Sequence, residues 1–281
     1  LHEFKNFEGE RIFIQEEPPS FLAYHAAKMC GFKIITMPHN IETMMYGYNE
    51  DFFTKEEFPL NVYNELKFIG VSDLVFCISR EEQWLLNNLR IPSGFLPYYP
   101  PQKKMDEMLQ IRELRMKSNK SDEYLIISTV ENPATINSLD TQIKLLEQVQ
   151  NEIPLRVRLI GYGTEKLKPS YAAYGFLEVE GTVTPERMRT LTSQCKAALI
   201  HQNTGPGALT KIPELLLGGV PVIANAHAAR SSFGYHDVLV YDDTISLQKC
   251  LIAAEKIEVA EMISPPTDHI SSFINQICRL I

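Results

Sequence analysis

Short apolar runs alternate with helix-forming segments along the whole chain, and this alternation restricts the fold more than any other feature. The runs typical of buried strands cover residues 11–15, 33–37, 73–79, 124–129, 155–160, 177–182, 197–200, 221–224 and 238–241. Helical segments separate most of them; in residues 57–70, for example, apolar side chains recur at a spacing that builds one buried face. Repeated strand–helix–strand units form parallel sheets covered by helices. The sequence therefore predicts an α/β fold whose ligands bind beyond the carboxyl ends of the strands.

A charged segment interrupts this pattern in the middle of the chain. Residues 102–122 are helix-forming and rich in Lys, Arg, Asp and Glu, and the strand pattern resumes after them. A chain of 281 residues is long enough for two domains. We expect an N-terminal domain over residues 1–112 and a second domain over 119–264. A last helix within 265–281 is free to pack back on the N-terminal domain.

The composition is that of a globular protein, with 44% hydrophobic and 22% charged residues. A net charge of −8 argues against broad binding to nucleic acid. The five cysteines are far apart and form no pattern at zinc spacing, which predicts a reducing, cytoplasmic environment and no bound metal. We see no apolar run long enough for a membrane span and no signal peptide.

One stretch, Thr204–Ala224, combines the features of an anion-binding site. Gly205 and Gly207 leave backbone amides accessible, and a helix expected from about Leu209 offers further amides. Lys211 adds a positive charge and Glu214 adds a carboxylate one turn later. A sugar nucleotide with a diphosphate requires this set of groups. An ordinary turn into a core helix has the same spacing, and both interpretations stay open on spacing alone.

Other polar residues follow strands elsewhere. His39 and Asn40 come after the strand at 33–37, where either a site or a turn capped by asparagine fits the pattern. His201 and His227 also follow strand ends and are weaker candidates. We interpret Glu65 as an interdomain or capping contact rather than a catalytic group.

Several of these patterns occur in one order. They are Pro38-His-Asn-Ile-Glu42, Glu65, Asp73 with Ser79 and Glu82, Leu96-Pro97, Pro133 with Asn137, Gly161-Tyr-Gly163, Gly181-Thr-Val183 and Gly205-x-Gly207-x-x-x-Lys211-x-x-Glu214-x-x-x-Gly218-x-x-Pro221-Val222. In this order the chain resembles the GT-B glycosyltransferases of the group 1 type, also called family 4. The resemblance covers most of the chain, and its C-terminal motif is the more specific part. It implies two Rossmann-like domains whose parallel sheets face each other across a cleft, with a nucleotide-sugar donor held mainly by the C-terminal domain.

The resemblance also implies roles for individual residues. Glu214 matches the glutamate that hydrogen-bonds the donor ribose, and Lys211 matches a basic residue near the diphosphate. His39 falls where the N-terminal domain approaches the sugar and the acceptor, so His39, Lys211 and Glu214 are the catalytic candidates. The remaining donor-binding candidates lie in three segments: Gly161 and Gly163; Thr182 and Val183, which would hold the base; and Gly205, Gly207, Ala208 and Leu209, which would surround the phosphates.

Three departures from the family pattern matter. Pro206 occupies the position of a second glutamate that normally contacts the sugar. A basic pair expected after the first strand of the second domain is not evident in Thr129–Asn137, which gives Lys211 and the amides a larger share of the charge stabilisation. The glycine-rich first strand and loop of the N-terminal domain are also not evident, because the chain begins at Leu1 close to the strand at 11–15.

The resemblance predicts a glycosyltransferase that moves a sugar from a nucleotide-diphosphate donor to a glycan or lipid-linked acceptor. It implies a retaining, metal-independent reaction without a cofactor, and it leaves peripheral membrane contact open. The departures favour a second hypothesis, a degenerate GT-B scaffold that acts as an inactive binding or partner subunit. A nucleotide-sugar epimerase on the same architecture is a third.

Overall fold

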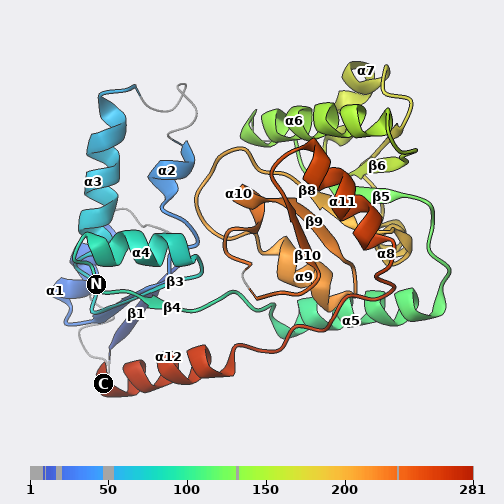
Figure 1. Cartoon of the computed structure of the whole chain (residues 1–281). Coiled ribbons are helices and arrows are strands. Elements are labelled where there is room, and N and C mark those ends of the chain that lie inside the picture. Colours follow the sequence, from blue (N-terminus) through green and yellow to red (C-terminus); the bar gives the residue numbers. More distant parts are fainter. Residues whose placement is uncertain are drawn as a thin grey trace. The chain divides into compact units, whose positions relative to one another are not determined.

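The computed structural model describes residue 9 and residues 11–16, 21–46, 54–130, 133–232 and 234–280 (Figure 1). Contacts divide the chain into two compact units. Unit 1 contains Leu1–Tyr98, Gly205–Ala208 and Pro265–Ile281, and unit 2 contains Tyr99–Thr204 and Leu209–Ser264. The charged helix α5 (Gln102–Lys117) therefore lies in unit 2, whereas the sequence assigns residues up to 112 to the N-terminal domain. The physical reason is that Arg112 and Arg115 of α5 donate to backbone carbonyls of unit 2.

Unit 1 contains a parallel sheet of four strands in the order β1-β2-β3-β4. Its strands are β1 (Ile12–Gln15), β2 (Lys33–Thr36), β3 (Leu74–Cys77) and β4 (Gly94–Phe95). Its helices are α1 (Phe21–Met29), α2 (Glu42–Tyr46), α3 (Glu57–Ile69), α4 (Arg80–Asn88) and α12 (Thr267–Leu280). The apolar side chains Ile34, Ile35, Val75 and Cys77 of the two central strands are buried, as expected for a sheet covered on both faces.

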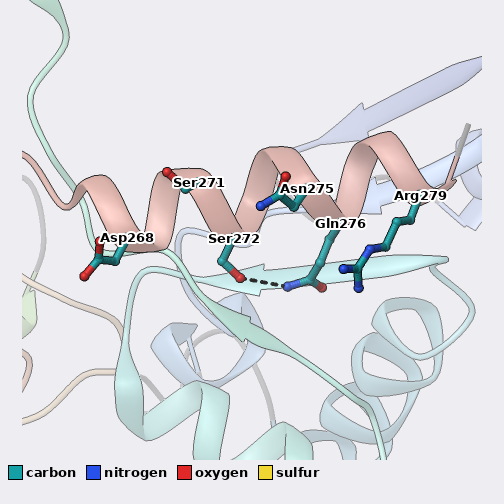
Figure 2. Close-up of a pocket in the computed structure, with 6 residues that line it drawn as sticks. All are labelled: Asp268, Ser271, Ser272, Asn275, Gln276 and Arg279. Carbon is teal, nitrogen blue, oxygen red and sulfur yellow. Dashed lines mark hydrogen bonds between the residues drawn. The ribbon is translucent and has the colours of Figure 1, made fainter.

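The C-terminal helix α12 packs on this sheet through aromatic side chains. Phe273 meets Phe76 of β3 edge-to-face with ring centroids 4.8 Å apart, and His269 meets Phe95 of β4 at 5.2 Å. Another side of α12 is polar and forms a shallow, open depression (Figure 2), lined by Asp268, Ser271, Ser272, Asn275, Gln276 and Arg279. All of these residues come from one helix, so the depression has no second wall that would enclose a ligand.

Unit 2 contains a parallel sheet of six strands in the order β10-β9-β8-β5-β6-β7. The strands are β5 (Tyr124–Ile127), β6 (Val157–Ile160), β7 (Leu177–Gly181), β8 (Ala198–Ile200), β9 (Val222–Asn225) and β10 (Val238–Tyr241). Besides α5, the helices are α6 (Pro133–Gln150), the 3₁₀ helix η2 (Thr164–Leu167), α7 (Lys168–Tyr171), α8 (Pro185–Gln194), α9 (Lys211–Leu217), α10 (Ala226–Ala229) and α11 (Thr244–Ala254). From β5 the chain runs to one side through β6 and β7, and then to the other side through β8, β9 and β10. The order reverses between β5 and β8, which is the place where open α/β sheets bind ligands.

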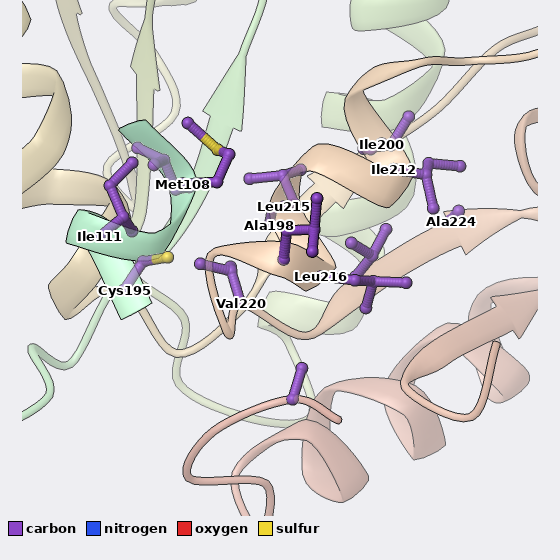
Figure 3. Packing of buried hydrophobic residues seen from close by; sticks show 14 of the residues in the cluster. Met108, Ile111, Cys195, Ala198, Ile200, Ile212, Leu215, Leu216, Val220 and Ala224 are labelled. Atoms are coloured by element: carbon purple, nitrogen blue, oxygen red, sulfur yellow. The ribbon is translucent and has the colours of Figure 1, made fainter. Parts of the chain in front are cut away.

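An apolar core anchors α9 and α5 to one face of this sheet (Figure 3). Ile212 and Leu216 of α9 are buried together with Ala198 and Ala224 of the sheet and Ile111 of α5. Burial of several aliphatic side chains, each contributing roughly 1.5–3 kcal/mol, fixes α9 on the sheet. The strand-and-helix order predicted from the sequence, with two parallel-sheet α/β domains, is therefore confirmed.

Some local predictions were wrong. The sequence predicts a loop over residues 130–137, but α6 begins at Pro133, because proline suits the first turn of a helix. The sequence predicts Thr244 as the cap of the helix α11, but Asp243 caps it. The Asp243 carboxylate accepts from Ser246 N at 2.7 Å in a reciprocal capping box. The short helices η2, α7 and α10 were not predicted. The expected break at Pro18-Pro19, the cap at Ser20 and most of the segment 47–56 lie outside the described residues.

Candidate functional site

The carboxyl end of the six-stranded sheet carries the predicted cation. Lys211 is the first residue of α9, and its ammonium donates to the carbonyl oxygen of Ile127, the last residue of β5, at 3.2 Å. Loss of hydration lowers the pKa of Lys211, and the negative charge of Glu214 opposes this decrease. The helix begins two residues later than expected, at Lys211 instead of Leu209. The ammonium thus lies at the strand whose two neighbours, β6 and β8, mark the reversal of strand order.

Glu214 lies one turn after Lys211 on the same helix, so the two side chains share a face. Its side chain is 20% exposed, and Lys104 of α5 places Nζ 3.7 Å from its Oε2 atom. The adjacent residues Ile212, Pro213 and Leu215 are buried, which leaves Glu214 on the accessible side of α9. A carboxylate in this position is able to accept hydrogen bonds from ligand hydroxyls.

Helix α5 also holds the carboxyl-terminal end of α9. The guanidinium of Arg112 donates to the carbonyl oxygens of Leu216 and Leu217 and to that of Ala260, each at 2.8 Å. The donors to Leu216 and Leu217 add hydrogen bonds to carbonyls at the end of α9, where the positive charge also suits the negative end of the helix dipole. The middle of α9, at Glu214, and its carboxyl-terminal end are therefore both in contact with α5.

The two glycines after β6 are required by close packing. Gly161 has φ +126°, and a Cβ atom at this position would lie 1.8 Å from the carbonyl oxygen of Ser128. Gly163 has φ +78°, and its amide donates to Thr182 Oγ1 at 3.4 Å. Thr182 in turn donates to Glu165 Oε2 through its amide at 3.2 Å and its hydroxyl at 3.1 Å. The structure thus brings together Gly161, Gly163 and Thr182 at the ends of β6 and β7.

Val183 and Leu209 are partly buried and pack against the unit 2 core, so their side chains are structural and only their backbone groups remain for a ligand. Contacts group the preceding loop, Gly205–Ala208, with unit 1. A Cβ atom on Gly207, which has φ +77°, would lie 1.8 Å from Oδ1 of Asn40. Gly205 also has positive φ, at +119°. Both glycines therefore adopt backbone conformations that other residues rarely take.

His39 lies in unit 1 on the loop between β2 and α2. Its side chain is 53% exposed, and Nε2 is 3.9 Å from a carboxylate oxygen of Glu16. Two buried glutamates fix this loop: Glu65 accepts from the amides of Glu42 and Thr43 at 2.7 and 2.8 Å, and Glu82 accepts from Ile41 N at 2.8 Å. Glu65 is thus a capping residue of α2.

His201 takes part in a polar network at the end of β8. Its Nδ1 atom is 2.7 Å from the Tyr241 hydroxyl, and its Nε2 atom is 2.7 Å from Asn203 Oδ1. Asn203 uses Nδ2 to donate to Asn137 O and Thr141 Oγ1, so its Oδ1 must face the histidine and accept from Nε2. Loss of hydration lowers the pKa of His201, and the nearby His227 lowers it further, whereas Asn203 opposes the shift. His201 therefore acts as a structural link that orders the segment before Thr204.

Within the described residues, no group of three or more His, Cys, Asp or Glu side chains is arranged to hold a metal ion. None of the helices in the same part of the chain is both long enough and apolar enough to cross a membrane.

The structure is similar to solved glycosyltransferases, although no protein-family model and no curated protein sequence matches the chain. It aligns with sucrose-phosphate synthase from Thermosynechococcus elongatus over 96% of this chain and 73% of that one, with TM-score 0.64 and 13% identity. HepE from Anabaena, solved with UDP, aligns over 94% of this chain and 79% of its own, with TM-score 0.64 and 12% identity. The catalytic domain of starch synthase IV from Arabidopsis thaliana, bound to ADP and acarbose, aligns over 96% of this chain and 72% of its own, with TM-score 0.59 and 11% identity.

The chain has the GT-B fold. Identities of 11–13% establish the architecture and not the reaction. The expected two Rossmann-like domains are confirmed.

The sequence did not identify Lys104 and Arg112 as contributors to the site. Both lie in the charged segment 102–122, whose composition alone is typical of a solvated helix. One signal was available: Met108 and Ile111 lie on the same side of α5 and are buried, so the segment had an inward face.

Proposed function

We propose that this protein is a glycosyltransferase that transfers a sugar from a nucleotide-diphosphate donor. The observation that carries the proposal is the position of Lys211, whose ammonium is 3.2 Å from Ile127 O at the point where the strand order reverses. Glu214 follows on the same face of α9. A cation and a carboxylate one helical turn apart suit the diphosphate and the ribose of a nucleotide sugar.

Each group has a distinct task in this proposal. Glu214 accepts hydrogen bonds from the ribose hydroxyls and positions the donor. Lys211 and the amides near Gly207, Ala208 and Leu209 stabilise the negative charge on the departing diphosphate. Gly161 and Gly163 leave room for the donor, and the backbone of Thr182 and Val183 holds the base. His39, on its fixed loop in unit 1, is assigned to the sugar and the acceptor on the resemblance alone.

The comparisons support a nucleotide donor in a limited way. HepE was solved with UDP and with UDP-glucose, and starch synthase IV was solved with ADP and acarbose. By analogy, the donor is a nucleoside diphosphate sugar and the acceptor is a glycan or a lipid-linked sugar. Retention of configuration and independence of metal are part of the proposal. A lipid-linked acceptor would bring the protein into peripheral contact with a membrane from the cytoplasm.

Calorimetric titration with UDP, GDP, TDP, ADP and UDP-glucose tests donor binding. We expect one nucleoside diphosphate to bind and Glu214→Ala to weaken its binding by about 10-fold to 100-fold, because hydrogen bonds to a charged group contribute ~1.5–3 kcal/mol. Glu113→Ala is the matched control, since Glu113 is an exposed glutamate on α5. Release of diphosphate from the bound sugar nucleotide, with and without glycan acceptors, then tests transfer.

The outcomes separate the hypotheses. If none of the nucleotides binds, the proposal is wrong and an inactive scaffold, as Pro206 would favour, is the better account. If the donor binds and its sugar changes without an acceptor, the protein is an epimerase. Binding that Glu214→Ala leaves unchanged contradicts the role of Glu214.

A further inference from the structure

Lys104 of α5 contacts the carboxylate of the proposed ribose site. Its Nζ atom is 3.7 Å from Oε2 of Glu214 and 3.4 Å from Oε2 of Glu107, one turn further along α5. The Lys104 side chain is 35% exposed and that of Glu214 is 20% exposed. The ammonium therefore lies beside Glu214 in a partly desolvated position, where an ion pair is stronger than on an open surface.

The backbone positions of these two residues are fixed relative to each other. Arg112, two turns after Lys104 on α5, donates to the carbonyl oxygens of Leu216 and Leu217 at the end of α9. Arg115 is 3% exposed and ties α5 to the carbonyl oxygens of Cys195 and Glu258. Because α5 and α9 are both attached to unit 2, Lys104 contacts Glu214 with little loss of backbone entropy.

A carboxylate has about four lone-pair directions, so an ion pair with one ammonium leaves some of them able to accept further hydrogen bonds. A neighbouring cation instead restricts the rotamer of the carboxylate, which leaves its other lone pairs in a fixed direction for ligand hydroxyls. Glu107 competes for the same ammonium, so the contact of Lys104 with Glu214 is adjustable when a ligand arrives.

We propose that Lys104 is a positioning residue that holds the Glu214 carboxylate in the orientation needed to bind the ribose hydroxyls of a nucleoside diphosphate. This inference rests on the proposed function, since it assigns a partner to the carboxylate in that site. Lys104 itself touches neither the ribose nor the phosphates. Its loss therefore weakens recognition of the ribose and leaves recognition of the diphosphate unchanged.

Ribose selectivity provides a measurement that a general structural role would not change. UDP, GDP and ADP are titrated, each paired with its 2′,3′-dideoxy analogue, and selectivity is the ratio of the two dissociation constants. We expect the unmodified protein to prefer one ribonucleotide by about 10-fold or more. Lys104→Met should reduce this preference about threefold to fivefold, the size expected for an ion pair with partial exposure. Binding of the dideoxy analogue should stay the same.

Three variants control the measurement. Lys103→Met removes an equal charge from the adjacent exposed position and should keep the full preference. Lys104→Arg restores a cation and should recover most of the preference. Glu214→Gln should lose the preference, and adding Lys104→Met to it should cause no further change, because the proposed effect passes through Glu214.

The possible failures are distinguishable. If the unmodified protein binds no nucleotide, both proposals are wrong. If it binds both members of each pair equally, the ribose role of Glu214 and the inference about Lys104 are wrong, although a nucleotide still binds. If the preference exists and Lys104→Met retains it, only the inference about Lys104 is wrong. An equal loss of affinity for both members of a pair also refutes it, because it would indicate a general effect of charge or of packing.

Discussion

Replacement of Arg115 by methionine is expected to destabilise unit 2 strongly. Arg115 is 3% exposed, and its guanidinium donates to four carbonyl oxygens: Cys195 at 2.6 Å, Glu258 at 2.9 Å, Lys196 at 3.2 Å and Ser193 at 3.3 Å. Methionine fills most of the same volume but donates to none of them. The carbonyl oxygens at the end of α8 and at the start of β8 would then lack these donors.

The size of the effect follows from two opposing contributions. Hydrogen bonds to a charged donor contribute ~1.5–3 kcal/mol each, and two of the four have short distances. Removal of a buried charge recovers part of its desolvation cost. We expect the free energy of unfolding to fall by about 3 kcal/mol, which corresponds to a decrease of about 6–12 °C in the midpoint of a domain of this size.

Thermal unfolding followed by circular dichroism measures this change. Trp84, the single tryptophan of the chain, lies on α4 in unit 1, so its fluorescence reports that unit separately. Arg156→Met, at an exposed position in unit 2, is the control and should shift the midpoint by less than about 2 °C. If Arg115→Met also shifts the midpoint by less than about 2 °C, the four hydrogen bonds add nothing to stability.

Two further predictions concern the ends of the unit 2 strands. Gly161→Ala should lower the unfolding midpoint by about 10 °C or prevent folding, because the new Cβ atom would lie 1.8 Å from Ser128 O at a φ of +126°. Gly175→Ala is the control: its new Cβ atom would have no other atom within 4 Å, so its midpoint should stay within about 2 °C of the unmodified protein. Equal midpoints for the two variants would contradict the close packing at Gly161. His201 has a lowered pKa in the folded state, so the unfolded state binds more protons below about pH 6.5, and stability should fall as the pH decreases from about 7. In chemical unfolding at pH 5.5 and 7.5, His201→Gln should show a smaller difference between the two pH values, and an unchanged difference would exclude His201 as its source.

Much of the fold was accessible from the sequence because buried parallel strands consist of short apolar runs. Val222, Ile223 and Ala224 are fully buried in β9, and their pattern alone identified the strand. Helix caps with side-chain acceptors follow a sequence pattern as well. Ser79 and Thr184 each precede a helix-forming segment, and each accepts from the amide three residues later at the start of α4 and α8.

The missing parts depended on contacts distant in sequence. Lys104 precedes Glu214 by 110 positions, and only the fold brings Lys104 Nζ to 3.7 Å from Glu214 Oε2. Arg112 likewise donates to main-chain carbonyls, which every residue carries, so no pattern of side chains predicts the contact. The roles assigned to His39, Lys211 and Glu214 in catalysis stay predictions, because geometry gives their positions and not their reactivity.

The contacts of Arg112 with α9 have a consequence for protein engineering. Arg112 recognises the main-chain oxygens of Leu216 and Leu217 and is indifferent to their side chains. The attachment of α9 to α5 should therefore survive exchange of its exposed residues, provided that the buried face is kept. Lys211 and Glu214 lie outside that buried face. Substitutions at these two positions should therefore change ligand preference without detaching α9 from the sheet or from α5.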